Sequence, residues 1–156
     1  MLARIAVGAT LIVLVAPSFG QSNSKDREFP RVVARVEFHN QSGAIPSTTF
    51  FIPDHDGLFR VSGYADVPVQ AECNGQDAFF AGVSYTDDQR QLGQIFMIFD
   101  LTSAFGPQGS LILESKAGMP INLLVTNDVP CQDITQAGQY NLYVVLEELS
   151  PVNRDH

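Results

Sequence analysis

Basic residues are scarce in this sequence, with 9 Lys and Arg against 17 Asp and Glu and a formal net charge of −8 over 156 residues. Nucleic-acid-binding proteins need clustered positive charge to neutralise phosphates, so this balance argues against a nucleic-acid partner. Charged residues as a whole make up only 17% of the chain, whereas hydrophobic residues make up an ordinary 45%. This composition indicates a folded chain, and the length fits one domain.

Long hydrophobic runs are also lacking. The run Ile5–Ala16 has 12 residues, which is short for a membrane-spanning helix of about 20 residues. It follows Arg4, and small residues precede a possible cleavage point between Gly20 and Gln21. This arrangement is typical of a secretory signal peptide, with an uncleaved anchor helix as the alternative. We therefore expect residues 1–20 to form a helical leader, and the mature domain to be secreted or periplasmic without a membrane span.

The sequence contains 2 cysteines, Cys73 and Cys131. In an exported protein such a pair favours a disulfide, which would stabilise the fold by about 4 kcal/mol if unstrained. A zinc site would require further Cys or His residues in close spacing. A nucleophilic thiol would require a histidine partner, and the candidates are His39, His55 and His156. The disulfide is the interpretation that needs no additional residue.

Catalytic motifs are lacking as well, because G-x-S-x-G, H-E-x-x-H and the P-loop do not occur. The sequence therefore predicts no enzyme and no cofactor. The densest polar group is Asp54, His55 and Asp56, which precede Gly57. Two carboxylates and an imidazole could hold a cation, but calcium requires six to eight oxygen ligands. Asp and Gly are also typical turn residues, so we expect a turn, with a metal site as the alternative.

Short segments with alternating apolar and polar residues make up the rest of the chain, and this pattern predicts β-strands. The expected strands are 31–38, 48–52, 58–67, 78–86, 91–101, 110–114, 121–126 and 139–149. Turn residues separate them, and no segment has the pattern of an amphipathic helix. The sequence thus predicts an all-β fold, an antiparallel β-sandwich or jelly roll of about eight strands over residues 31–150. Residues 21–30 are a flexible lead-in, and residues 151–156 are a C-terminal tail.

The segment Thr48–Val67 resembles a strand–turn–strand unit of C1q/TNF-like jelly-roll domains, with an extended strand ending at Pro53 and an aromatic-rich strand after Gly57. The segment 116–121 is similar to the entry into that family's penultimate strand, and 139–149 is similar to its closing strand. The Phe-Ser pair usual in that family is replaced by Val-Ser. The resemblance implies an extracellular or envelope domain, commonly trimeric, that binds ligands rather than converting them.

Two pairs of adjacent aromatic residues, Phe50-Phe51 and Phe79-Phe80, lie on expected strands. Neighbouring side chains of a strand point to opposite faces, so each pair should place one ring inside and one outside. The outer rings could be covered by a loop or by the second sheet. Alternatively, they could form an apolar patch through which the domain associates with copies of itself.

Three functions follow from these observations. The first is a self-associating interaction or structural module, with a trimer favoured by the resemblance and an unknown protein or carbohydrate ligand. The second is a carbohydrate-binding module, which requires an exposed aromatic platform beside Asp or Asn. The sequence has no Trp, so the candidates are its 4 tyrosines, Tyr64, Tyr85, Tyr140 and Tyr143. The third is a small enzyme on a β scaffold, which requires His39 and His55 to converge.

Overall fold

Antiparallel β-strands make up the fold, as a computed structural model of the chain shows. It describes residues 12–14, 29–72, 77–88, 90–103, 106–129 and 137–151, which contain nine strands and no helix. The strands are β1 (Ile12–Leu14), β2 (Arg31–Gln41), β3 (Ile45–Phe51), β4 (Gly57–Val69), β5 (Ala78–Thr86), β6 (Gln91–Asp100), β7 (Gln108–Ser115), β8 (Ile121–Val129) and β9 (Gln139–Pro151). Accordingly, these residues include no helix that could cross a membrane.

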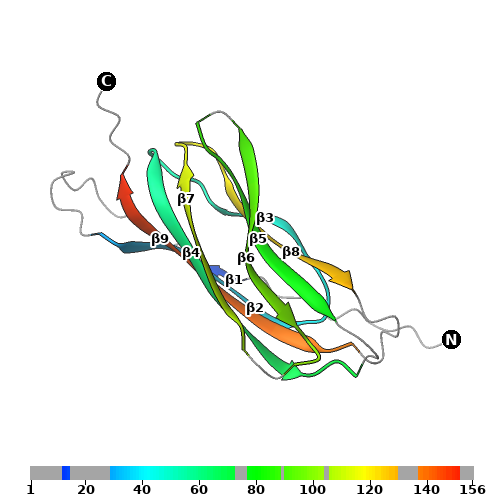
Figure 1. Cartoon of the computed structure of the whole chain (residues 1–156). Coiled ribbons are helices and arrows are strands. Elements are labelled where there is room, and N and C mark those ends of the chain that lie inside the picture. Colours follow the sequence, from blue (N-terminus) through cyan, green and yellow to red (C-terminus); the bar gives the residue numbers. More distant parts are fainter. Residues whose placement is uncertain are drawn as a thin grey trace.

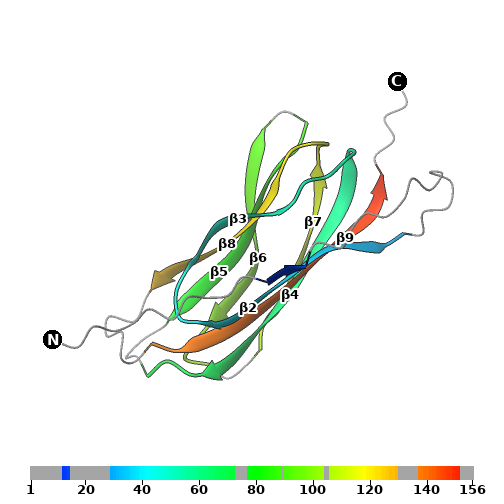
Figure 2. The same ribbon diagram turned by 180° about the vertical axis from the view of Figure 1, so that it is seen from behind.

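The strands form two sheets that pack on each other (Figure 1). The five-stranded sheet has the order β1-β2-β9-β4-β7, and the four-stranded sheet has the order β3-β8-β5-β6. All strand pairs are antiparallel. Seen from behind, β1 lies beside β2 at the edge of the five-stranded sheet (Figure 2). This arrangement confirms the all-β antiparallel sandwich that the sequence predicts.

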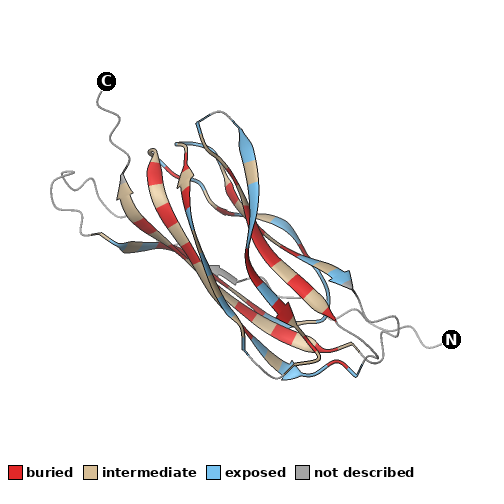
Figure 3. Cartoon of the chain, in the orientation of Figure 1, coloured by how far each residue is buried: buried red, intermediate tan, exposed pale blue. Residues whose placement is uncertain are grey.

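Alternating burial along the strands explains why these segments form sheets. Along β4 and β9 buried bands alternate with more exposed ones (Figure 3). On β9, for example, Glu147 faces outward and pairs with Arg60 at 2.8 Å, whereas Glu148 is only 1% exposed. A period of two residues places one side of each strand in the core and the other in solvent.

The core between the sheets is built from aromatic and aliphatic side chains. The rings of Phe79, Phe99 and Tyr140 meet with centroids 5.0–5.4 Å apart. The Tyr140 hydroxyl donates a hydrogen bond of 2.7 Å to the carbonyl of Gly43. Burial raises the pKa of this phenol well above its ordinary value. Each fully buried apolar side chain of this kind contributes about 1.5–3 kcal/mol to folding.

The sequence predicts a helical leader over residues 1–20, of which the structure describes residues 12–14. Ile12–Leu14 lies in the predicted leader helix but forms strand β1, in which Ile12 pairs with Glu37 and Leu14 with Arg35. Ile and Val favour strands, and the free edge of β2 offers unpaired backbone groups to a neighbouring segment. The helix is therefore wrong for these three residues. The Gly20/Gln21 junction lies outside the described residues, so cleavage stays a prediction.

Two further sequence predictions concern the cysteines and the aromatic pairs. Cys73 and Cys131 fall in the segments 73–76 and 130–136, which lie outside the described residues, and their disulfide stays a prediction. The aromatic pairs are largely internal, since Phe50 is 7% and Phe79 is 0% exposed. These two rings are therefore part of the core and are not available for self-association.

The other ring of each pair is half-buried. The Phe51 ring packs against the core, with its centroid 5.9 Å from that of Phe59. The one-in, one-out expectation is wrong for this pair, because the β3–β8 pairing is irregular between Thr49 and Phe51 and both rings are covered. Phe80 alternates with the buried Phe79 and lies on the outer side of β5.

Candidate functional site

The acidic turn before β4 is divided between two sets of contacts. His55 Nε2 lies 2.6 Å from Glu148 Oε1, and His55 Nδ1 lies 2.5 Å from Asp54 Oδ1. Asp56 instead accepts hydrogen bonds from Lys116 Nζ at 2.8 Å and from the Ala117 backbone N–H at 2.9 Å. The three turn residues therefore do not converge on one point. Glycine has a specific role in the facing turn, where Gly118 adopts a positive φ of 72°.

Glu148 is the centre of the cluster around His55. Its carboxylate is 1% exposed and also accepts a bond of 2.7 Å from Arg31 Nε, with Arg31 Nη2 at 2.6 Å. A carboxylate can only accept, so both ring nitrogens of His55 can donate to their partners when the imidazole is protonated. These contacts connect β9, the start of β2 and the loop after β3. Their role is structural, because buried charges require partners.

The alternative of a metal site at Asp54, His55 and Asp56 gains no support from these contacts. Both nitrogens of His55 already face carboxylates, and Asp56 is paired with Lys116. Within the described part of the chain, no group of three or more His, Cys, Asp or Glu is placed to hold a metal ion. Nor do the two histidines converge, because His39 contacts Glu37 and Tyr143 and has no partner in common with His55.

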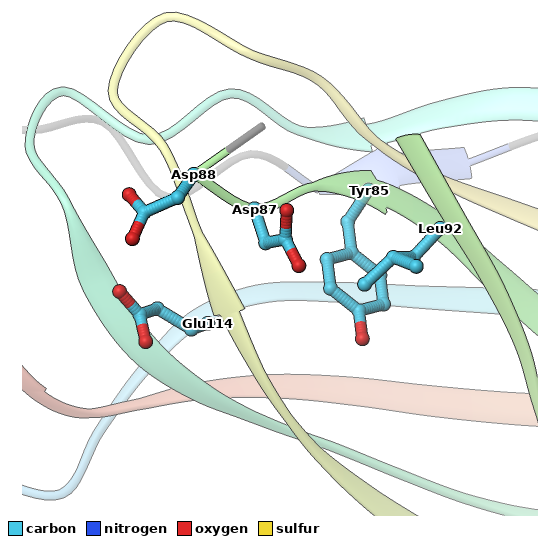
Figure 4. Close-up of a pocket in the computed structure, with 5 residues that line it drawn as sticks. All are labelled: Tyr85, Asp87, Asp88, Leu92 and Glu114. Atoms are coloured by element: carbon cyan, nitrogen blue, oxygen red, sulfur yellow. The ribbon is translucent and has the colours of Figure 1, made fainter. Parts of the chain in front are cut away.

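A small open pocket lies where the β5–β6 hairpin approaches β7 (Figure 4). It has a volume of about 160 Å³ and is lined by Tyr85, Asp87, Asp88, Leu92 and Glu114. Burial, followed by the charge of Asp87, raises the pKa of Tyr85. Asp88 already pairs with Lys116 at 2.6 Å. Ligand pockets usually enclose about 300–1,000 Å³, so this one is too small to hold a typical organic ligand.

The outer face of the five-stranded sheet carries a pair of stacked tyrosines. Tyr64 of β4 and Tyr143 of β9 are directly opposite in the antiparallel register. Their ring centroids lie 4.5 Å apart with an interplanar angle of 13°, and Tyr64 is 48% exposed. On the other side, His39 of β2 approaches Tyr143 edge-on, with centroids 5.6 Å apart. We call Tyr64, Tyr143 and His39 the aromatic platform.

Polar groups surround the aromatic platform and are fixed by hydrogen bonds. Asn141 Nδ2 donates to Asp66 Oδ2 at 3.3 Å, and Asn141 Oδ1 accepts from the backbone N–H of Asn40 at 2.9 Å. Glu37 lies opposite Tyr143 in the β2–β9 register, and its Oε2 is 3.4 Å from His39 Nε2. Each of these side chains can exchange hydrogen bonds with hydroxyl groups.

The ring of Tyr64 has one face covered and one face open for contacts. Tyr143 covers the face toward β9, so the other face is directed toward the edge strand β7, where Gln108 is the register partner of Tyr64. Gln108 and Ser110 on β7 are exposed. An aromatic face beside flexible amide and hydroxyl groups is suited to a ligand with both C–H and O–H surfaces.

Of the four candidate tyrosines, the structure places two on the surface and two in the interior. Tyr85 is 5% and Tyr140 is 0% exposed, so neither can form a platform. Sequence alternation could assign Tyr64 and Tyr143 to outward positions, because their neighbours Ala65 and Val144 are buried. Their stacking depends on the β4–β9 register, for which the sequence contains no signal.

The outer face of the four-stranded sheet has a different character. Ile95 and Ile98 are 57% and 59% exposed on β6. Phe80 of β5 pairs with Ile98, and Gly82 pairs with both Ile95 and Leu124 of β8. Phe80 and Leu124 are half-buried. We call Phe80, Ile95, Ile98 and Leu124 the apolar patch, which was not predicted beyond Phe80.

Comparison with known proteins gives similarity in fold alone. No family model matches the chain, and no curated protein matches it. Similar solved structures include a CBM22-2 xylan-binding domain from Paenibacillus barcinonensis Xyn10C, 10% identical with a TM-score of 0.44, over 94% of this chain and 91% of that one. They also include Eiger TNF from S. frugiperda, 13% identical with a TM-score of 0.44, over 81% of this chain and 98% of that one.

A third similar structure is the CBM22-1-GH10 part of a Clostridium thermocellum xylanase, Xyn10B, in complex with xylohexaose. It is 12% identical with a TM-score of 0.40, and the match covers 97% of this chain and only 27% of that chain. At these identities the similarities extend to the all-β arrangement and no further. The β-sandwich implied by the C1q/TNF-like resemblance is present, and membership of that family stays an expectation.

Proposed function

We propose that the chain is an exported carbohydrate-binding domain that holds its ligand on the aromatic platform without converting it. The observation that carries this proposal is the stacking of the exposed Tyr64 on the half-buried Tyr143, beside Asp66 and Asn141. This is the combination of aromatic rings and Asp or Asn that a carbohydrate-binding module requires. It also favours the second of the functions considered from the sequence over the first.

The chemistry of the platform fits a sugar. A pyranose ring has a C–H-rich face that can pack on the open face of Tyr64, and hydroxyl groups along its edge. Asp66 on β4 and Gln108 on β7 lie beside that face and can exchange hydrogen bonds with such hydroxyls. Asp66 and Asn141 hold each other in place, so little side-chain freedom has to be lost on binding.

Alternative sites on the described surface are less suitable. The pocket beside Tyr85 encloses only about 160 Å³, and the turn at His55 is occupied by its contacts with Glu148 and Asp54. The apolar patch is bordered by the exposed Thr126, the register partner of Phe80, but in the described part of the chain it has no carboxylate and amide pair like Asp66 and Asn141. Among the residues that the structure describes, the aromatic platform is the place that combines exposure, aromatic surface and fixed polar groups.

Calorimetric titration with oligosaccharides tests this proposal. The variants Tyr64→Ala and Tyr143→Ala should each weaken binding, because they remove the stacking surface. Ile98→Ala on the opposite sheet is the matched control, since it removes a similarly exposed apolar side chain and should leave binding unchanged. Equal losses in the platform and control variants would contradict a binding site at the platform, as would a complete lack of binding by the parent protein.

The apolar patch favours a second candidate function, self-association of the domain. Copies of a chain with 17 acidic and 9 basic residues repel each other. That repulsion is smallest where uncharged side chains face each other, as Phe80, Ile95, Ile98 and Leu124 would do. Sedimentation at micromolar concentration tests this function: the parent should form oligomers, with the trimer of the C1q/TNF-like expectation as one stoichiometry, and Ile95→Thr/Ile98→Thr should be monomeric. A monomeric parent would exclude the self-association.

A further inference from the structure

Negative charge surrounds the aromatic platform. Glu37 lies directly opposite Tyr143 on β2, and Asp66 lies two residues after Tyr64 on the same side of β4. The two carboxylates therefore border the stacked rings from different strands. The Glu37 side chain is 43% exposed, and Asp66 is exposed, so both can reach a bound ligand.

The other charged and titratable groups on this face leave the negative charge in excess. Arg35 of β2 lies on the same side as Glu37 and contributes one positive charge. His39 is next to Glu37 and becomes positive only when protonated. Further along the same outer face, Arg60 of β4 and Glu147 of β9 are opposite each other and form an ion pair. Two carboxylates against one unpaired guanidinium give the platform a net negative charge.

The Tyr143 phenol experiences this charge directly. Its pKa is raised above the ordinary value by desolvation, by the neighbouring Tyr64 and by the carboxylates of Asp66 and Glu37. A raised pKa means that an additional negative charge is disfavoured at the ring. Desolvation disfavours a charge of either sign, whereas the carboxylates of Asp66 and Glu37 favour a ligand that brings a positive charge to the same place.

We propose that the ligand of the aromatic platform is a chain of amino sugars that crosses the stacked rings and places its protonated amines beside Glu37 on the β2 side and beside Asp66 on the β4 side. This inference rests on the proposed carbohydrate binding and specifies its ligand class. Tyrosine rings attract cations through their electron-rich faces. Carboxylates form charge-assisted hydrogen bonds with ammonium groups. Sugar acids place a negative charge beside the same carboxylates and are rejected.

Titration with three oligosaccharides of equal length tests the ligand class. The probes are a β-linked glucosamine oligomer, its N-acetylated and therefore uncharged counterpart, and a galacturonic acid oligomer. At a pH at which the amines are protonated, the glucosamine oligomer should bind most tightly and the galacturonic acid oligomer least. The preference should decrease as salt is added, because exposed charges are screened over about 10 Å at 0.1 M ionic strength.

Variants that remove single charges test which residues cause the preference for the glucosamine oligomer. Glu37→Gln and Asp66→Asn should each weaken binding of the glucosamine oligomer about threefold more than they weaken binding of the N-acetylated oligomer. Arg35→Gln should strengthen binding of the glucosamine oligomer. Asp128→Asn is the matched control, because Asp128 is an exposed carboxylate on the opposite sheet. It changes the net charge equally and should have little effect.

The possible outcomes separate this inference from the proposed function. Binding of the N-acetylated or acidic oligomer as tight as that of the glucosamine oligomer, and lost with Tyr64→Ala, would overturn the amino-sugar preference and leave carbohydrate binding in place. If Asp128→Asn and Asp66→Asn weakened binding of the glucosamine oligomer equally, the preference would arise from the net charge of the protein. That result would overturn the placement of the amines beside Asp66. Failure of all three probes to bind would contradict both proposals for these ligand classes.

Discussion

The two outer faces of the sandwich differ in what they expose, although the same alternation of residues builds both. The outer face of the five-stranded sheet carries stacked tyrosines held among hydrogen-bonded polar groups, with Tyr64 48% exposed. The outer face of the four-stranded sheet exposes Ile95 and Ile98 at 57% and 59%. The inward sides of both sheets are similar, so the fold itself does not distinguish them. The outward residues do, although Ile112 of β7 is also 57% exposed on the five-stranded side, and we propose sugar binding on one face and self-association on the other.

The largest effect expected on this comparison comes from removing both rings of the platform. Tyr64→Ala/Tyr143→Ala should weaken oligosaccharide binding about a hundredfold, because we expect each aromatic ring at the centre of the binding site to contribute about 1.4 kcal/mol, which is a factor of ten in affinity. Ile95→Ala/Ile98→Ala removes comparable exposed surface from the other face and should not change the affinity. Calorimetric titration measures both variants, and a loss of similar size in the second would remove the distinction between the faces.

A second variant tests whether the platform depends on the buried charge cluster at the end of the same strands. Arg31→Met leaves Glu148 buried with His55 as its remaining partner. We expect a loss of about 2 kcal/mol in the free energy of unfolding, less than for a fully buried pair because the Arg31 side chain is 40% exposed. Urea denaturation measures it. Oligosaccharide affinity of the folded variant should stay at the parental value.

Arg90→Met is the matched control for that measurement. Arg90 lies 3.8 Å from Asp87, and its side chain is 74% exposed. Exposed pairs contribute little, so its removal should cost less than about 0.5 kcal/mol. If Arg31→Met and Arg90→Met had the same effect, the cluster around Glu148 would have no special role in stability.

A smaller effect is expected from the contact between the core and the loop after β2. Tyr140→Phe removes the hydrogen bond of 2.7 Å to the carbonyl of Gly43 while keeping the aromatic ring. The free energy of unfolding should decrease by about 1 kcal/mol. Because Tyr140 lies in the shared core, both outer faces should keep their properties. A change in oligosaccharide binding in this variant would show that the platform is not independent of the core.

The smallest effect concerns the negative charge beside the aromatic platform. Titration of the phenol absorbance should give Tyr143 a pKa above the ordinary value of 10.0, and comparison with Tyr143→Phe assigns the signal. Asp66→Asn removes a negative charge that disfavours the phenolate, so the pKa should fall toward 10.0. Asp128→Asn on the opposite sheet should leave it unchanged. If the pKa of Tyr143 fell equally in both variants, the net charge of the protein would explain the shift, and Asp66 would have no local effect.

The sequence was sufficient for the strands and insufficient for the surfaces. Alternation located the eight strands from Arg31 onward, because a period of two residues is a local property of the chain. The same alternation puts Glu147 and Glu148 on opposite sides of the last strand, and the structure shows that Glu148 is the buried one. The partners of Glu148 are Arg31, far away in the sequence, and His55 in a turn. These contacts depend on which strands are neighbours in the sheet. Local sequence patterns contain no information about strand order.

The site illustrates the same limit. From the sequence, Tyr64 and Tyr143 are two of four candidates for an aromatic platform. Their stacking arises because β4 pairs with β9, which is far away in the sequence. For Phe50 and Phe51, an irregularity in the β3–β8 pairing placed both rings under cover. Single-residue shifts in register change which face a side chain occupies.

The most direct test of the central claim is a chemical-shift map of the backbone amides during titration with the glucosamine oligomer. The account predicts that the amides that shift cluster around Glu37, Tyr64 and Tyr143, on three neighbouring strands of the five-stranded sheet. The amides of Phe80, Ile95 and Leu124 should stay in place. Shifts confined to the four-stranded sheet, or to the hairpin beside Tyr85, would contradict the account.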